Sequence, residues 1–166
     1  LIGTIDTYLI FRMTLGEVFA TDPTNASRTL LFDIHRRAWD DELCSWWQVP
    51  VNALAEVRDC DAHFGATTLD GLLPRAVPIL GVMGDSQAAM FAQGCFEPGT
   101  AKATFGSGTS VLMNVGSSLA LTRGGAVTSL AWAQGGQVTY ALEGIINWSA
   151  ATMNWLRDQL GLIVDF

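Results

Sequence analysis

The stretch Gly84-Asp85-Ser86-Gln87 decides the fold prediction, together with Phe105-Gly106-Ser107-Gly108-Thr109 further along the chain. The first stretch places a carboxylate where an apolar segment passes into a helix of small residues. The second places a hydroxyl between two glycines, in a turn that joins two strands. A carboxylate can take the proton of an attacking hydroxyl group, and glycine-flanked amides can bind phosphate oxygens. Together the two stretches favour phosphoryl transfer.

Each stretch also has a purely structural interpretation. Aspartate is a favoured residue at the N-cap of a helix, where Asp85 would bind amides of the first turn. The Gly106 to Gly108 turn could be a tight hairpin that needs glycine only for its backbone angles. The residues alone leave both alternatives open.

The composition predicts a packed globular protein and argues against a nucleic-acid partner. The 166 residues suffice for one domain or for two incomplete halves, and 49% of them are hydrophobic while 15% are charged. With a net charge of −7, the chain lacks the basic surface that binding to nucleic acid requires. A nucleotide remains an admissible ligand, because backbone amides and a bound cation can hold its phosphates.

Cysteines and histidines give no sign of a metal site. Cys44, Cys60 and Cys95 are too few and too irregularly spaced for a disulfide framework or a zinc site, so we expect structural thiols in a reducing, cytoplasmic compartment. His35 and His63 are expected in loops, without a catalytic partner. No apolar run approaches the roughly twenty residues of a membrane span, and no Walker-type phosphate loop is present.

The hydrophobic spacing predicts a mixed α/β chain with a strand-rich second half. Asp22 to Asn25 is expected to be a turn, and Asp40 to cap a helix that stops at Pro50. The polar stretch 56–75 contains glycines and ends near Pro74, which favours a domain boundary there. Further expectations are helices at 3–12, 86–93 and 146–160, a strand buried on both faces at 77–82, and strands at 100–105, 109–115, 126–132 and 137–142.

The chain resembles the FGGY family of carbohydrate kinases, and within it the members that act on glycerol. The resemblance covers nearly the whole chain. It is carried by GTIDTYLIFRMT at 3–14, TDPTNASRTLLFDI at 21–34, VPILGVMGDSQAAMFAQGCFEPGTAKATFGSGTSVLMNVG at 77–116 and YALEGIINWSAATMNWLRDQLGLI at 140–163.

The resemblance implies a two-domain kinase of the actin and hexokinase (ribonuclease H-like) fold type, of which this chain is a central fragment. Residues 1–74 would be the C-terminal part of the N-terminal FGGY domain, and residues 75–166 the N-terminal part of the C-terminal FGGY domain. ATP and the polyol or sugar would meet in the cleft between the domains. The family's Asp-x-Gly-Thr phosphate motif and its Mg²⁺-associated aspartate would precede residue 1.

The family's functional residues map onto this chain as follows. Asp85 would be the general base and would contact the substrate, as would Ser86, where glycerol kinases commonly carry Gln. The nucleotide would be bound by Gly106, Ser107, Gly108, Ala150 and Asn154, at which the family usually has Thr for Ser107, Gly for Ala150 and Gln for Asn154. No metal ligand is assigned, although ATP and Mg²⁺ are the implied cofactors.

The function expected of the full-length parent is ATP-dependent phosphorylation of a polyol or sugar hydroxyl, with glycerol to glycerol 3-phosphate first. The fragment alone is expected to be inactive. Two alternatives stay open: a kinase of a pentulose or another sugar, which Ser86 favours, and a non-catalytic nucleotide-binding fragment. The expected partner is a small molecule, not nucleic acid or membrane, and a homo-oligomer is an open option.

Overall fold

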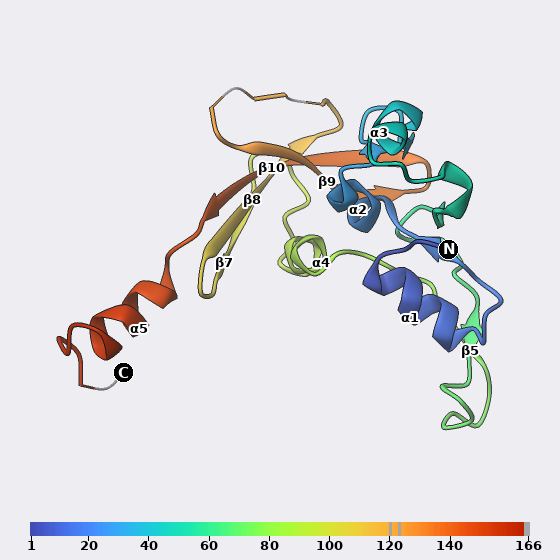
Figure 1. The fold of residues 1–166 in the computed structure, drawn as a ribbon, viewed down its shortest axis with the longest axis horizontal. Helices are drawn as coiled ribbons and strands as arrows, with labels where there is room; N and C mark the ends of the chain where they lie inside the picture. Colours follow the sequence, from blue (N-terminus) through green and yellow to red (C-terminus); the bar gives the residue numbers. More distant parts are fainter. Residues whose placement is uncertain (120, 123, 165–166) are drawn as a thin grey trace.

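A four-stranded antiparallel sheet forms the centre of the computed structural model, which describes residues 1–119, 121–122 and 124–164. Its strands lie in the order β7-β8-β10-β9. Figure 1 shows the N-terminal helices on one side of this sheet and the C-terminal helix beyond its opposite end. The strands are β7 (Ala101–Phe105), β8 (Thr109–Gly116), β9 (Val127–Gln134) and β10 (Gln137–Ile146).

Short elements surround the sheet. The helices are α1 (Ile5–Met13), α2 (Pro23–Ala26), α3 (Asp41–Trp46), α4 (Asp85–Ala92) and α5 (Ala150–Asp158), with 3-10 helices η1 (Ser27–Thr29) and η2 (Val51–Ala53). The two-stranded pairs are β1 (Ala20–Thr21) with β4 (Glu56–Val57), β2 (Phe32–Asp33) with β3 (Ala38–Trp39), and β5 (Ala66–Thr67) with β6 (Val77–Pro78). Among the described residues, no helix is both long enough and apolar enough to cross a membrane.

The core lies between α4 and one face of the sheet. Met90 of α4 is fully buried and packs in one cluster with Leu112 of β8 and Ala141 of β10. Cys60 and Cys95 belong to the same cluster, and the third cysteine, Cys44, is buried elsewhere, so the expectation of structural thiols is confirmed. His35 and His63 are exposed, as predicted.

A buried carboxylate, Asp22, joins the N-terminal elements to the core. Asp22 caps α2 and has no exposed surface. Its Oδ2 accepts hydrogen bonds from the N–H (2.8 Å) and hydroxyl (2.6 Å) of Thr24, and its Oδ1 accepts from the Asn25 side chain at 2.7 Å. The Cys60 thiol also donates to Oδ2, at 3.2 Å, and burial together with this carboxylate raises the pKa of Cys60, which keeps the thiol protonated.

The same network reaches the start of α4. The Thr24 hydroxyl, which donates to Asp22, accepts a hydrogen bond from the N–H of Gly84 at 2.8 Å. Since α2 also packs against β9, the position of α4 relative to the sheet is fixed from the N-terminal part of the chain.

Three local predictions are wrong. Residues 22–25 do not form an open turn but begin helix α2, because Asp22 caps it and Pro23 occupies its first position. Residues 77–82 are not a buried strand: only β6 at 77–78 is extended and paired, and Leu80 is 58% exposed. Pro78 lacks the N–H that a central strand needs. Finally, Ile146 ends β10, so the last helix begins four residues later than predicted.

The remaining predictions of secondary structure are confirmed to within a few residues, including the hairpin of β9 and β10 about Gly135-Gly136 and the capping of α3 by Asp40. β5 and β6 pair with each other across Pro74, so the chain is hydrogen-bonded on both sides of the expected boundary. The division into 1–74 and 75–166 remains a proposal.

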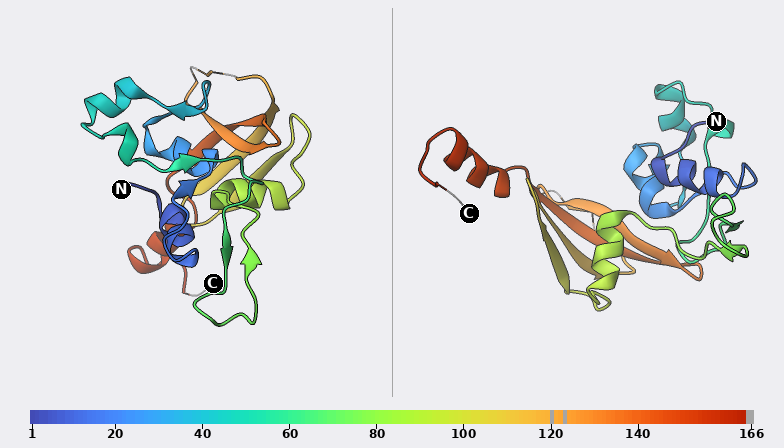
Figure 2. Two further views of the ribbon diagram at one scale, coloured as in Figure 1. Left: turned by 90° about the vertical axis from the view of Figure 1, so that its right-hand side faces the viewer. Right: turned by 90° about the horizontal axis from the view of Figure 1, so that it is seen from below.

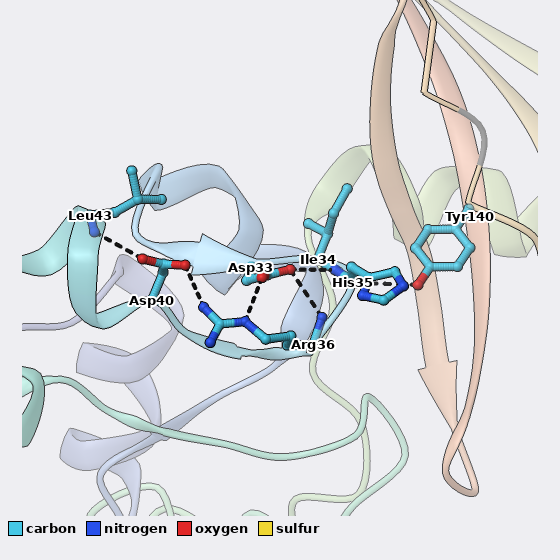
Figure 3. Close-up of polar contacts among 7 residues, drawn as sticks. All are labelled: Asp33, Ile34, His35, Arg36, Asp40, Leu43 and Tyr140. Atoms are coloured by element: carbon cyan, nitrogen blue, oxygen red, sulfur yellow. Dashed lines mark hydrogen bonds and ion pairs between the residues drawn. The ribbon is translucent and has the colours of Figure 1, made fainter.

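The loop between β2 and β3 is held by two carboxylates and one guanidinium (Figure 3). Asp33 accepts from Arg36 Nε at 2.7 Å and from the N–H groups of Arg36 (3.0 Å) and His35 (2.8 Å). These hydrogen bonds, the Arg36 side chain first, lower the pKa of Asp33 from 3.8 to about 2. Arg36 also pairs with Asp40, which accepts from the N–H of Leu43 at 2.9 Å.

This loop is also tied to the central sheet. The hydroxyl of Tyr140 on β10 donates to the carbonyl oxygen of Ile34 at 3.2 Å, as Figure 3 shows. Phe32, Leu130 and Tyr140 belong to one buried cluster, so the hairpin packs on the face of the sheet opposite to α4.

The Asp22 network gives a first test. Asp22→Asn should lower the free energy of unfolding by about 2–4 kcal/mol, because buried donors lose a charged acceptor and α2 loses its cap. Denaturant unfolding of the protein and the variant measures this difference. Glu17→Gln, at an exposed position, is the matched control and should change stability by less than about 0.5 kcal/mol. Equal stability of the two variants would contradict the role of Asp22.

The loop carboxylate gives a second test. Because the folded-state pKa of Asp33 lies below its ordinary value, its stabilising contribution is complete above pH 3.8 and is lost as the pH falls towards about 2. A titration of the Asp33 carboxyl carbon by NMR should have its midpoint at about 2. Arg36→Met should move this midpoint back towards 3.8, and an unchanged midpoint in that variant would contradict the assigned cause.

Candidate functional site

The Gly106 to Gly108 turn is bonded directly to the start of α5. The carbonyl oxygen of Gly106 accepts from the N–H of Ala150 at 3.1 Å, and that of Ser107 accepts from the N–H groups of Ser149 (2.9 Å) and Ala151 (3.2 Å). The structure therefore brings together Ala150 and the predicted phosphate turn, which are more than forty positions apart in the sequence.

Donors of this turn remain free for a ligand. Within the described residues, no hydrogen bond uses the N–H of Ser107, the N–H of Gly108 or the hydroxyl of Ser107. Ser107 is exposed. Neighbouring free amides and a hydroxyl are donors suited to an anionic oxygen.

The glycines are needed for a different reason from the one expected. Neither Gly106 nor Gly108 has a positive φ, so left-handed backbone geometry does not explain them. A Cβ on Gly108 would lie 2.7 Å from the carbonyl oxygen of Ile146 and 3.3 Å from that of Asn147, whereas Gly106 has room. Gly108 therefore permits the close approach of the chain that leads into α5.

Asp85 is not the N-cap of α4. Gly84 occupies the N-cap position, and Asp85 is the first helical residue. Its Oδ1 accepts from the N–H of Ser86 at 2.6 Å, and the side chain is exposed. No hydrogen bond within the described residues uses Oδ2, which leaves one carboxylate oxygen open to a ligand. The N-cap interpretation of this residue is thus wrong.

The side chain of Gln87, two residues after Asp85, points into the core. Gln87 is buried, and its Nε2 lies 3.4 Å from the Ser129 hydroxyl of β9. A Cβ on Gly84 would lie 2.7 Å from Gln87 Oε1, so this glycine allows the amide side chain to turn back under the helix. The Gln87 side chain is therefore not available to take the place of the glutamine expected at position 86 from the resemblance to glycerol kinases.

The two halves of the candidate site lie at the same end of α4 and β7. α4 contacts β7 and runs in roughly the opposite direction (Figure 2), so the first residue of α4, Asp85, and the turn that follows β7 lie towards the same end of these two elements. No hydrogen bond or ion pair joins Asp85 to the turn among the residues that the structure describes. Asn154 lies one turn beyond Ala150 on α5 and is exposed.

Charged side chains that the sequence reasoning missed occupy the sheet face beside α4. Lys102, Leu112 and Glu143 are cross-strand neighbours on β7, β8 and β10, and so share one face. Glu143 is paired with Arg28, the Nη1 to Oε2 distance being 2.7 Å, with side-chain exposures of 8% and 49%. Of these charged residues, only Lys102 could have been noticed from the sequence, because it is the single lysine and lies shortly before the glycine turn.

Comparison with known proteins identifies relatives of the chain. A profile of the FGGY family of carbohydrate kinases, N-terminal domain, matches residues 1–92. The glycerol kinase of Alteromonas mediterranea is 48% identical over 165 residues, which are 99% of this chain and 33% of that protein. The chain thus spans about a third of the length of the curated relatives it matches.

Solved structures agree with these matches. The Plasmodium falciparum glycerol kinase with ADP superposes with a TM-score of 0.90 at 35% identity, over 98% of this chain and 33% of that one. A ligand-bound xylulose kinase from Lactobacillus acidophilus has a TM-score of 0.81 at 17% identity, over 95% of this chain and 32% of that one, and shows the fold alone. Both likenesses confirm the predicted α/β fold class.

The close approach at Gly108 can be tested. Gly108→Ala should destabilise the protein by about 1–3 kcal/mol, because the added Cβ meets backbone oxygens that cannot rotate away. Gly106→Ala is the matched control, and since its Cβ meets only open space and one ordinary contact, it should cost less than about 1 kcal/mol. Thermal unfolding of both variants measures the difference, and equal costs would argue against the packing described.

Proposed function

Since the chain belongs to the FGGY family of carbohydrate kinases, with a partial fold of the actin and hexokinase type, we propose that its full-length parent transfers a phosphoryl group from ATP to a hydroxyl group of glycerol. The observation that carries this proposal is the pairing of a free donor group at the Ser107 turn with an exposed carboxylate at Asp85, both at one end of α4 and β7.

Asp85 is the proposed general base. Its free Oδ2 can accept the proton of a primary hydroxyl as that oxygen attacks the γ-phosphorus. Hydrogen bonds fix the start of the helix that carries this carboxylate. The Gly84 N–H donates to the Thr24 hydroxyl, which in turn donates to Asp22. A base on a fixed helix start loses little freedom when substrate binds.

The turn is the proposed phosphate cradle. The free N–H groups of Ser107 and Gly108 and the Ser107 hydroxyl would donate to phosphate oxygens. Ala150 can contact the nucleotide only through its other atoms, since its N–H already donates to Gly106. Asn154, one turn further along α5, would reach the nucleotide with its side-chain amide.

The described residues offer no cluster of side chains that would hold the implied Mg²⁺. Among the described residues, no three His, Cys, Asp or Glu side chains are grouped so as to hold a metal ion. We therefore assign no step of the transfer to a metal held by this chain. The residues of this chain form half of the proposed active site. Residues 1–74 and 75–166 are the proposed parts of two domains. The proposed enzyme is cytoplasmic.

Glycerol is the first proposed substrate because the relatives named above include glycerol kinases that match the chain along its whole length. A pentulose or related sugar is the second, and one observation favours it. Ser86 is shorter than the glutamine common at this position, and the adjacent Gln87 is turned into the core. A shorter side chain beside Asp85 is compatible with a larger acceptor.

The base assignment is tested in the full-length parent. Asp85→Asn should lower kcat by about 10²–10⁴-fold, because the attacking hydroxyl loses its proton acceptor, with little change in the KM for ATP. An ADP-release assay with glycerol and a panel of pentuloses measures turnover and identifies the acceptor. Asp70→Asn, at an exposed position, is the control.

A turnover of Asp85→Asn within a few fold of the unaltered enzyme would show that Asp85 is not the base. If the unaltered parent binds ATP but phosphorylates no member of the panel, the non-catalytic nucleotide-binding alternative is correct instead.

A further inference from the structure

Lys102 is a buried cation with no counter-ion among the described residues. It is the only lysine in the sequence and is 2% exposed, although lysine is almost never fully buried unless it is paired. Its Nζ donates to the Thr104 hydroxyl at 2.7 Å. Among the residues that the structure describes, this ammonium makes no ion pair and no second hydrogen bond. One neutral hydroxyl does not offset the cost of burying an ammonium.

The carboxylate nearest in the register is already used. Lys102 pairs with Leu112 on β8, which in turn pairs with Glu143 on β10, so two strand spacings of about 4.8 Å separate the two charged residues. Glu143 is bound by Arg28 at 2.7 Å and accepts from the Ser110 hydroxyl at 3.4 Å. On this face of the sheet, Glu143 is thus paired with Arg28, whereas Lys102 forms no ion pair with a described residue.

The ammonium is directed towards the candidate site. Thr104, its partner, is exposed and lies two residues nearer to the Gly106 turn than Lys102 does. Lys102 itself is covered, and its ammonium is bound to Thr104 on the side of Lys102 that leads along β7 towards the turn. Since the Gly106 turn directly follows β7, this cation is held on the strand that leads into the proposed phosphate turn.

We infer that Lys102 is a phosphate-binding residue, whose ammonium contacts oxygens of the β- and γ-phosphates of the bound nucleotide. This inference rests on the proposed function. During transfer the bond between the γ-phosphorus and the bridging β-oxygen breaks, and a bond from the γ-phosphorus to the substrate oxygen forms. Asp85 takes the hydroxyl proton. The Lys102 ammonium stabilises the negative charge that shifts onto the β-phosphate.

The test is a series of ligands that differ only in phosphate number. Binding of adenosine, AMP, ADP and a non-hydrolysable ATP analogue to the full-length parent is measured by calorimetry, with Lys102→Met, Lys102→Arg and the unaltered protein. Lys102→Met should weaken ADP and the ATP analogue by about 10- to 100-fold, as expected for a lost charged hydrogen bond, and leave adenosine and AMP within about twofold. Lys102→Arg should recover part of the loss.

Arg37→Met is the matched control, since it removes an equal charge from an exposed residue whose side chain donates to the Gly136 carbonyl oxygen. It should weaken no member of the series. If Lys102→Met does not fold, Lys102→Gln, which keeps a donor for Thr104, takes its place in the same measurement.

A uniform loss across the series, adenosine included, would show that Lys102 serves the fold and would overturn the inference. Unchanged ADP affinity in the folded variant would overturn it as well. Failure of the proposed function looks different: the unaltered parent would then bind ADP with a Lys102-dependent phosphate contact but transfer no phosphoryl group. A parent that binds no nucleotide would overturn both.

Discussion

The carboxylate of Asp22 is the constraint on which the arrangement of the site depends. It is buried, forms no ion pair with any residue that the structure describes, and is satisfied by donors from Thr24, Asn25 and Cys60. Such an acceptor is tolerated in a core only when donors surround it, so these residues must come together for the protein to fold. Thr24 passes the constraint on to Gly84, which fixes the start of α4 and thereby the place of Asp85.

The central sheet fixes the other half of the site by backbone contacts. The β7 to β8 hairpin and the start of α5 are joined through carbonyl oxygens of Gly106 and Ser107, and these contacts use none of the amide donors of Ser107 and Gly108. On one face of this sheet, Glu143 forms an ion pair with Arg28, and Lys102 binds the Thr104 hydroxyl without an ion pair to a described residue. Base, cradle and cation therefore depend on three separate sets of contacts.

Predictions that rest on local chemistry are confirmed. Asp40 caps α3 because its own side chain reaches the Leu43 N–H, and β9 and β10 turn at Gly135-Gly136, where both glycines have positive φ. Predictions that depend on which elements pack beside a segment are less successful. The apolar run at 77–82 is typical of a buried strand, yet Pro78 and the absence of neighbouring strands leave only a two-residue pair with β5.

The sequence by itself determined the α/β class, most element positions, and the two short stretches about Asp85 and Ser107, because capping, turn formation and alternation act between near neighbours in the chain. Only the tertiary structure decided that Gly108 serves close packing and that Lys102 is buried with no anion beside it among the described residues. Gly108 is constrained by Ile146 and Asn147, almost forty positions away, and burial and charge pairing are set by such distant contacts, not by the local pattern.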